Sequence, residues 1–244
     1  MTDNSKNAAS FDAADDIFGR MAESYDLLCD LFSLYAHRYW KSSLAKVIAA
    51  TPGENLLDVA AGTGDIGLRV AKLLDASART RPNKHIVLGD LCSKMLAVAE
   101  RKALRNGVEC EYRELNAHDL DGVADESVDI LSISFAMKIC NRDDVLAAAH
   151  RVLKPGGRFF CLEAARIPNR LVHSAYLAYM RLCVPLIALW VTKGDRSAYD
   201  YLLRGVHDFP DQTQFAREIE NAGFRDVTFD NLTFGIVALH SASK

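Results

Sequence analysis

The sequence contains no C-x-x-C pair, no stripe of basic residues and no segment typical of export or import. Its six cysteines stand apart from one another, which argues against a zinc site or a disulfide framework and predicts reduced, buried thiols. A formal net charge of −3 argues against a nucleic acid partner, because phosphate binding depends on clustered lysine and arginine. Residues 1–16 are polar and acidic, so residues 1–14 are expected to be a flexible leader of a cytoplasmic protein.

A long uncharged apolar run is also missing. Residues 168–191 approach the length of a membrane span but contain His173, Arg181 and Pro185, whereas a spanning helix needs about 20 nearly uncharged residues. The segment is therefore predicted to be a helix within an inserted cap over about residues 168–210. Two further roles stay open for it: a wall for a hydrophobic tail, or a patch resting on a membrane surface.

The composition and the hydrophobic pattern are those of a soluble globular chain. Hydrophobic residues make up 50% and charged residues 25%, which suits one domain over residues 15–244. Apolar residues at helical spacing predict two helices within residues 15–50. Strands and helices then alternate, which predicts a mostly parallel sheet with helices on both faces. The predicted strands are 55–59, 85–88, 110–115, 128–134, 158–163, 226–229 and 233–240; the helices between them are 65–74, 93–105 and 143–153.

Two helix boundaries carry specific signals. The sequence KPGG, with Pro155 as its second residue, ends the helix predicted over 143–153. Asp211 with Gln214 three residues later begins another helix, which Gly223 ends.

The segment LLDVAAGTGDIG contains G-x-G-x-x-G, a pattern usually read as a dinucleotide-binding turn. In a nicotinamide-binding turn the first glycine follows the strand directly. Here Asp58 lies four residues before Gly62, with Ala60 and Ala61 between them. A carboxylate that orders this longer loop suits the cationic amino group of a methionine moiety better than a phosphate, which favours S-adenosylmethionine. Glycines at 62 and 64 would let the backbone pass close beneath a ligand.

A second acid, Asp90, ends the strand HIVLGD. Its two oxygens can accept both ribose hydroxyls, but they would do so for a nicotinamide cofactor as well. The chain has no Y-x-x-x-K pair and no Cys/His dyad that would suggest hydride or acyl chemistry, so S-adenosylmethionine remains the favoured ligand. The alternative is that the glycine-rich turn only connects a strand tightly to a helix and binds no ligand. The order of Asp58, Asp90 and KPGG in the sequence argues against this alternative.

These residues, with LKPGG at 153–157, are those of class I S-adenosylmethionine-dependent methyltransferases. The stretches MAESYDLLCDLFSLYAHRYWK, SFAMKICNRDD, YDYLLRGVHDFPDQ and NLTFGIVALH resemble the ubiquinone/menaquinone biosynthesis C-methyltransferase family, and the resemblance covers about residues 17–240. It implies a Rossmann-like class I methyltransferase fold with a seven-stranded sheet and a helical cap. It also implies metal-free methyl transfer to a ring carbon of a reduced polyprenyl quinone precursor.

The resemblance assigns the cofactor site by position. Residues of the glycine loop would hold the methionine part, Asp90 the ribose, Met95 the adenine face and Asn116 the adenine edge. Ser134 would form the floor of the site, and Tyr25 would close over it. The full expected set is Tyr25, Asp58, Ala60, Gly62, Thr63, Gly64, Asp65, Asp90, Leu91, Met95, Asn116, Ala117 and Ser134.

The chain departs from the family where the acceptor is expected to bind. The family reads S-F-G-L-R-N after the fourth strand, whereas this chain has Ala136, Lys138 and Ile139 for the glycine, arginine and asparagine. Cys29 replaces another asparagine. Lysine keeps the charge of arginine without its planar fork, and isoleucine cannot form a hydrogen bond. One expectation is therefore an acceptor ring without the polar group that the asparagine of the family would contact.

Three residues are candidates for the chemistry. A quinol carbon becomes nucleophilic once the adjacent hydroxyl loses its proton. Lys138 could stabilise the phenolate or accept the proton, and otherwise is a solvated loop residue. His207 is a second candidate base, and otherwise it lies at the end of a surface helix. Glu163 is expected either to act on the substrate or to form a structural hydrogen bond. His37 and Trp40 are expected to pack between the first helices and the core.

Three functions remain open from the sequence. The first is C-methylation of a reduced quinone precursor, and the second is O- or N-methylation of another small aromatic metabolite. The third is an inactive cofactor-binding subunit of a biosynthetic complex, against which the intact glycine loop speaks. The expected partner is a hydrophobic aromatic substrate, with a homodimer, a biosynthetic complex and peripheral membrane contact as further possibilities.

Overall fold

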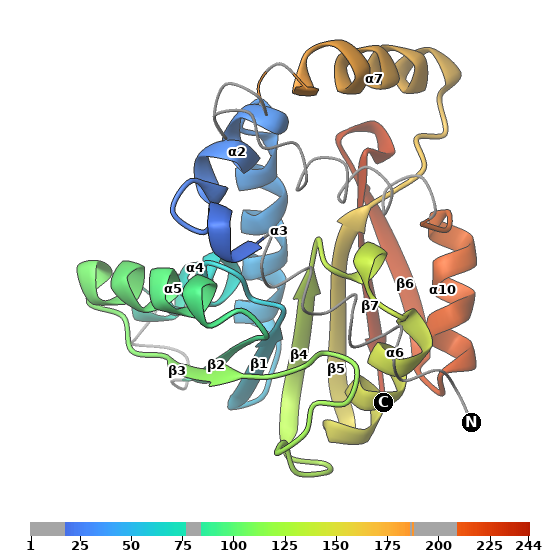
Figure 1. The fold of residues 1–244 in the computed structure, drawn as a ribbon. Coiled ribbons are helices and arrows are strands. Elements are labelled where there is room, and N and C mark those ends of the chain that lie inside the picture. The colour runs from blue at the N-terminus through green and yellow to red at the C-terminus, as the bar shows by residue number, and fades with distance from the viewer. Residues whose placement is uncertain (1–17, 77–83, 186, 188–208) are drawn as a thin grey trace, which may run out of the picture.

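The seven-stranded sheet has the order β3-β2-β1-β4-β5-β7-β6 (Figure 1). The computed structural model describes residues 18–76, 84–185, 187 and 209–244. Neighbouring strands from β3 to β5 pair in parallel, and β7 runs antiparallel to both β5 and β6. The mostly parallel sheet predicted from the sequence is confirmed. The strands are β1 (Asn55–Val59), β2 (His85–Asp90), β3 (Glu111–Glu114), β4 (Val128–Ser134), β5 (Leu153–Ala164), β6 (Arg225–Leu232) and β7 (Val237–Ser243).

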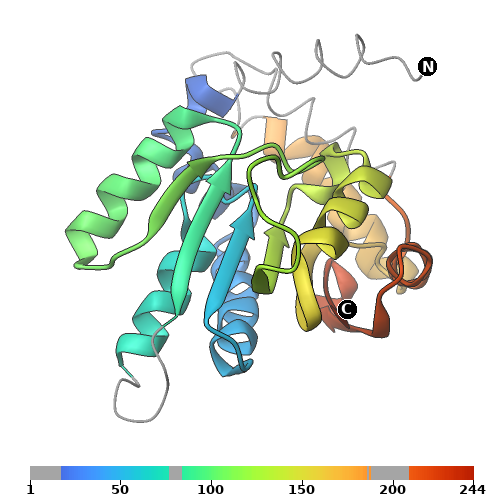
Figure 2. The same cartoon turned by 90° about the horizontal axis from the view of Figure 1, so that it is seen from below.

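Helices cover both faces of the sheet, and each face has its own hydrophobic core (Figures 1 and 2). One core joins α3 (Ala36–Ala50), α4 (Asp65–Asp75) and α5 (Ser93–Asn106) to the sheet. The other joins α6 (Arg142–Val152) and α10 (Gln212–Asn221). This burial on both faces explains why the central strands read as continuous apolar runs in the sequence. The remaining described helices are α2 (Tyr25–Phe32) and α7 (Arg170–Leu182), with 3-10 turns at Met137–Ile139 and Thr233–Gly235.

The capping signals in the sequence were correct, and the largest errors in the predicted strands lie at the starts of β5 and β7. Asp211 and Gln214 form a reciprocal capping box at α10. KPGG lies within β5, because the strand already begins at Leu153 and pairs there with β4 across a register shift. The last strand was predicted to begin at residue 233. Instead Thr233–Gly235 form the turn between β6 and β7, where the backbone adopts positive φ angles.

The prediction that all cysteines are buried was also wrong. All six are free thiols, but only Cys92 and Cys161 are buried. Cys29, Cys110 and Cys140 are partly exposed, and Cys183 is exposed. Cys183 follows α7, a helix without a single buried residue, so its apolar neighbours in the sequence do not enclose it.

The helix α7 confirms the helical start of the predicted cap, while residues 188–208 of that cap and the predicted leader lie outside the described residues. The two helices predicted within residues 15–50 are α2 and α3. Within the described ranges, no helix combines the length and the apolar character that crossing a bilayer requires.

Candidate cofactor site

The glycine turn leaves β1 at the point where the strand order reverses, between β2 on one side and β4 on the other. Open α/β sheets bind ligands at such a switch point. A Cβ on Gly62 would meet nothing within 4 Å, so the backbone there borders open space, as expected for a turn beneath a ligand. Gly64 differs, because its Cβ would come within 2.9 Å of the Ala99 Cβ on α5. Its φ of +76° and this close packing require glycine at position 64.

Asp58 is almost completely buried, with 1% of its surface exposed. The Ser132 hydroxyl donates to Oδ1 at 2.7 Å, whereas Oδ2 has no hydrogen-bond partner among the described residues. Burial raises the pKa of Asp58 to about 7. A buried carboxylate oxygen without a partner is costly, and a bound cation would compensate for it. These features fit the cationic methionine end of S-adenosylmethionine.

Asp90 joins the glycine turn to the end of β2. Its Oδ2 accepts from the Gly62 amide at 2.7 Å, and its Oδ1 accepts from the Cys92 amide at 2.8 Å. Each carboxylate oxygen can accept a further hydrogen bond, so both remain suited to ribose hydroxyls. Leu91, the next residue, is exposed.

Thr63 and Asp65 face the helices that cover the turn rather than open space. The Thr63 hydroxyl donates to Asp26 Oδ1 at 2.6 Å. The Lys41 ammonium donates to Asp65 Oδ2 at 3.0 Å. Burial opposes ionisation of Asp65, but Lys41, Lys102 and Arg69 outweigh it and hold its pKa well below the usual range. The sequence predicted cofactor contacts for Thr63 and Asp65; the structure shows contacts that hold the turn in place.

The helix α2 closes this edge of the site. Tyr25, the first residue of α2, has a pKa well above its usual value because of the nearby Cys29 thiol and its burial, and its contact with the cofactor remains a prediction. Met95 is buried in a small core between α2 and α5. In this arrangement Met95 packs against α2, and contact with an adenine remains a prediction.

The remaining cofactor candidates lie at the ends of β3 and β4. The Leu115 amide donates to the Asp90 carbonyl at 3.1 Å, which holds the Asn116–Ala117 segment beside the predicted ribose position. Asn116 is half-buried and Ala117 is buried in the core. Ser134 ends β4 and is half-buried. Asp58, Asp90, Asn116 and Ser134 thus lie at or just after the ends of four neighbouring strands, at one edge of the sheet.

Lys138 and Glu163 form a buried ion pair at the same edge. The Lys138 ammonium lies 2.9 Å from Glu163 Oε1, and the two side chains are 5% and 1% exposed. The ammonium also donates to the Phe135 carbonyl, and Glu163 Oε2 accepts from the Lys138 amide at 3.2 Å. The alternative of a solvated lysine was therefore wrong, and the structural hydrogen bond considered for Glu163 is present. The third candidate, His207, lies outside the described residues.

The packing roles of His37 and Trp40 are confirmed. Both are buried, and the Trp40 indole donates to the Thr233 hydroxyl at 2.7 Å. Sequence reasoning missed Lys41 and Asp26, which hold the glycine turn from the N-terminal helices. A signal was available for Lys41: it shares the buried stripe of α3 with Trp40 and Leu44, and a lysine on such a stripe needs an acidic partner.

Comparisons with known proteins agree with this geometry. A profile of the ubiE/COQ5 methyltransferase family matches residues 4–244. The mitochondrial 2-methoxy-6-polyprenyl-1,4-benzoquinol methylase of Dictyostelium discoideum is 36% identical over 94% of this chain and 80% of that protein. The ubiquinone/menaquinone biosynthesis C-methyltransferase UbiE of Brucella abortus is 38% identical over 94% of this chain and 84% of that protein.

Solved structures share the fold at low sequence identity. A SAM-dependent methyltransferase from Aquifex aeolicus superposes with a TM-score of 0.58 at 15% identity, covering 83% of this chain and 88% of that one. A possible histamine N-methyltransferase from Thermotoga maritima gives a TM-score of 0.60 at 18% identity, covering 94% and 99%.

The sheet order, the glycine turn and the acids at the ends of β1 and β2 define a class I methyltransferase that uses S-adenosylmethionine. Within that class, the chain belongs to the ubiE/COQ5 methyltransferase family. The resemblance seen in the sequence is thereby confirmed.

Proposed function

We propose that this enzyme methylates a ring carbon of a reduced polyprenyl benzoquinone or naphthoquinone precursor. The observation that carries the proposal is the similarity, over 94% of the chain, to relatives named as a polyprenyl benzoquinol methylase and as a quinone biosynthesis C-methyltransferase. The same relatives support the more general statement that the methyl acceptor is a hydrophobic small molecule.

The residues of the glycine turn have a binding role in this proposal. Asp58 and the backbone of the turn from Gly62 to Asp65 would hold the methionine part, and Asp90 the ribose. When bound, S-adenosylmethionine supplies an electrophilic methyl group. The protein then contributes mainly alignment and exclusion of water, and orientation of this kind accounts for about 7–11 kcal/mol in well-aligned reactions.

Lys138 is proposed to stabilise the phenolate of the acceptor. A lysine ammonium has three protons to donate, and Glu163 and the Phe135 carbonyl take two of them. In this proposal the third is donated to a substrate oxygen at this edge of the sheet. A cation beside a phenol favours the ionised form, which raises electron density on the neighbouring ring carbon. His207 remains a second proposed base.

Specific observations also support a membrane-surface contact, which a polyprenyl acceptor would require. The turn between α2 and α3 exposes Leu34 and Tyr35, and the first turn of α3 exposes Tyr39. This turn adjoins α7, because the Tyr179 hydroxyl donates to the Leu31 carbonyl at 2.9 Å. Leucines and tyrosines gathered at one end of a molecule suit the boundary between water and lipid.

The test is to incubate the protein with methyl-labelled S-adenosylmethionine and a reduced, unmethylated prenyl quinol, and to locate the label in the product by mass spectrometry and NMR. The proposal predicts a label on a ring carbon. A label on oxygen or on an added aromatic amine would support the alternative O- or N-methyltransferase. An Asp90→Ala variant serves as the control, and it is expected to lose cofactor binding while remaining folded.

A further inference from the structure

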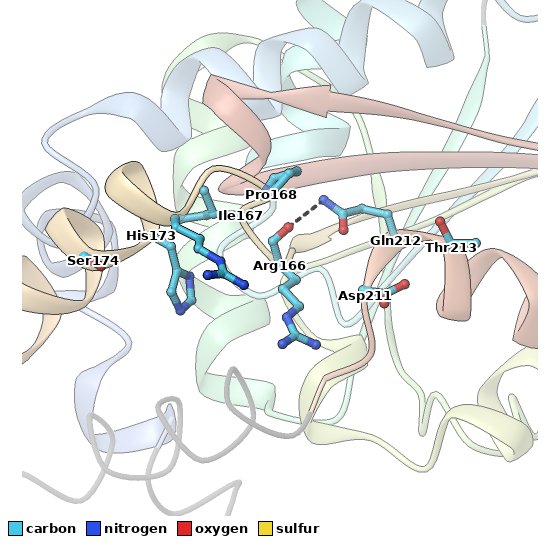
Figure 3. A pocket seen from close by; sticks show the side chains of 9 residues that line it. Arg166, Ile167, Pro168, His173, Ser174, Asp211, Gln212 and Thr213 are labelled. Carbon is cyan, nitrogen blue, oxygen red and sulfur yellow. Dashed lines mark hydrogen bonds between the residues drawn. The ribbon is translucent and has the colours of Figure 1, made fainter.

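A second pocket lies outside the glycine turn, where the chain leaves β5 and meets the beginnings of α7 and α10 (Figure 3). It is open to solvent and has a volume of about 560 Å³. None of its lining residues belongs to the predicted cofactor site. The lining residues are Arg166, Ile167, Pro168, Arg170, His173, Ser174, Asp211, Gln212 and Thr213.

Basic side chains dominate one wall of this pocket. Figure 3 shows Arg166 and His173 extending in the same direction, one from the segment after β5 and the other from the first turn of α7. Within the described part of the chain, neither Arg166 nor Arg170 has an ion-pair partner. The surrounding sequence offers none either, since residues 164–185 contain no aspartate or glutamate.

His173 adds an unsatisfied polar atom to the same wall. Its Nδ1 is buried and has no hydrogen-bond partner among the described residues. Buried polar atoms are usually satisfied, and this nitrogen is an exception in a residue that lines the pocket. Two guanidinium groups without an ion-pair partner among the described residues, together with an imidazole, form a donor set suited to an oxyanion.

The opposite wall contributes one acid and a helix end. The Asp211 carboxylate is committed to α10, because its Oδ1 accepts from the Gln214 amide at 2.9 Å. Gln212 is held by the Arg166 carbonyl and Asn231. The N-terminus of α10 carries a partial positive charge, which adds to the field of the arginines. With Arg166 and Arg170 charged and Asp211 ionised, the lining bears a net positive charge.

We propose that this pocket binds a phosphate group through Arg166, Arg170 and His173. The planar guanidinium fork matches a phosphate better than any other side chain. The pocket takes the group independently of the methyl acceptor, so the proposal stands apart from the quinone assignment.

The phosphate could belong to a lipid headgroup or to a soluble ion. The helix α7 continues from the pocket with an exposed apolar face, where Leu171 is 82% and Leu182 is 68% exposed. A headgroup in the pocket would place lipid chains beside this face. Inorganic phosphate would use the same donors without contacting the leucines.

The experiment titrates the full-length protein, by calorimetry at fixed ionic strength, with inorganic phosphate and separately with a soluble short-chain phosphatidylglycerol. Binding of either ligand is expected to weaken about tenfold or more in Arg166→Gln and in Arg170→Gln, because each variant removes charge-assisted hydrogen bonds to the phosphate. Binding of both ligands would indicate a general phosphate site. Binding of the lipid alone would identify a headgroup site, and a Leu171→Ser variant should then weaken it further.

Two variants make the test specific. Asp211→Asn keeps the helix cap, because asparagine also caps well, but it removes the one acid among the described lining residues and should strengthen binding. Arg105→Gln removes an exposed arginine at the end of α5 and should change nothing. Absence of binding by both ligands, or equal losses in Arg105→Gln and Arg170→Gln, would overturn the proposal. Thermal unfolding of each variant checks that it is folded.

Discussion

At the scale of single residues, the site depends on two acids that differ in their surroundings. Asp58 is enclosed by the sheet and has one oxygen without a partner, whereas both oxygens of Asp90 accept amide hydrogen bonds. The first is proposed to meet a cation that arrives with the ligand. The second fixes the turn before any ligand binds.

The raised pKa of Asp58 predicts that the free energy of unfolding of the cofactor-free protein falls as pH rises. Because the folded-state pKa, about 7, lies above the ordinary value of 3.8, the protonated carboxyl stabilises the fold fully below pH of about 4. That contribution is lost as pH rises to about 7. Asp58→Asn should therefore abolish a slope of up to about 1.4 kcal/mol per pH unit.

Urea unfolding of the wild type and of Asp58→Asn over this pH range measures the difference. The stabilities of the two proteins should diverge as pH rises, with the variant the more stable above pH of about 7. Asp121→Asn, an exposed site, controls for the loss of a charge. Parallel stability curves would show that the Asp58 carboxyl is ionised at no cost.

The buried pair of Lys138 and Glu163 predicts that folding stability and turnover respond differently to a single and a double substitution. Lys138→Met leaves a buried carboxylate without its partner and should cost about 3–5 kcal/mol of folding stability. Adding Glu163→Gln removes that charge and should restore most of the stability. If Lys138 stabilises the phenolate, turnover stays low in both variants while cofactor affinity is retained. Recovery of turnover in the double variant would mean that the pair is only structural.

At the scale of elements, α2 and α3 hold the glycine turn through polar side chains. Asp26 receives hydrogen bonds from Thr63 and Lys102, and Lys41 binds Asp65 at the start of α4. The turn is thus held from above by the N-terminal helices and from the side by Asp90. We expect the position of these helices to control how long the cofactor stays bound.

Asp26→Ala tests this coupling. The variant loses the hydrogen bonds to Thr63 and Lys102, so cofactor dissociation should become faster, measured by stopped-flow displacement. Because Asp26 is partly exposed, global stability should change by at most about 1 kcal/mol. Glu23→Ala is the matched control, since Glu23 pairs with Arg101 on the neighbouring surface. Equal dissociation rates in the two variants would contradict the coupling.

The elements predicted best were those whose ends have chemical signals. The capping box of Asp211 and Gln214 marked α10 correctly, because the signal is local to the chain. The start of β5 was missed because its pairing with β4 extends the strand through Pro155 and two glycines. Pairing across the sheet is a tertiary effect, and no local propensity contains it.

At the scale of the whole molecule, the sheet order brings distant residues to one edge. The sequence placed Asp58, Asp90, Asn116 and Ser134 at or just after the ends of four strands, and parallel pairing is enough to bring these ends together. What the sequence could not give is the direction of each side chain. The side chains of Thr63 and Asp65 contact α2, α3 and α5, a direction that only the packing of those helices determines. Their contact with the cofactor stays a prediction.

The most direct test of the account is a crystal structure of the protein with S-adenosylhomocysteine. The account predicts ribose hydroxyls on the Asp90 carboxylate, the amino acid end over the turn that begins at Gly62, and its ammonium group near Asp58. A ligand bound elsewhere, or a ribose that leaves Asp90 untouched, would contradict it.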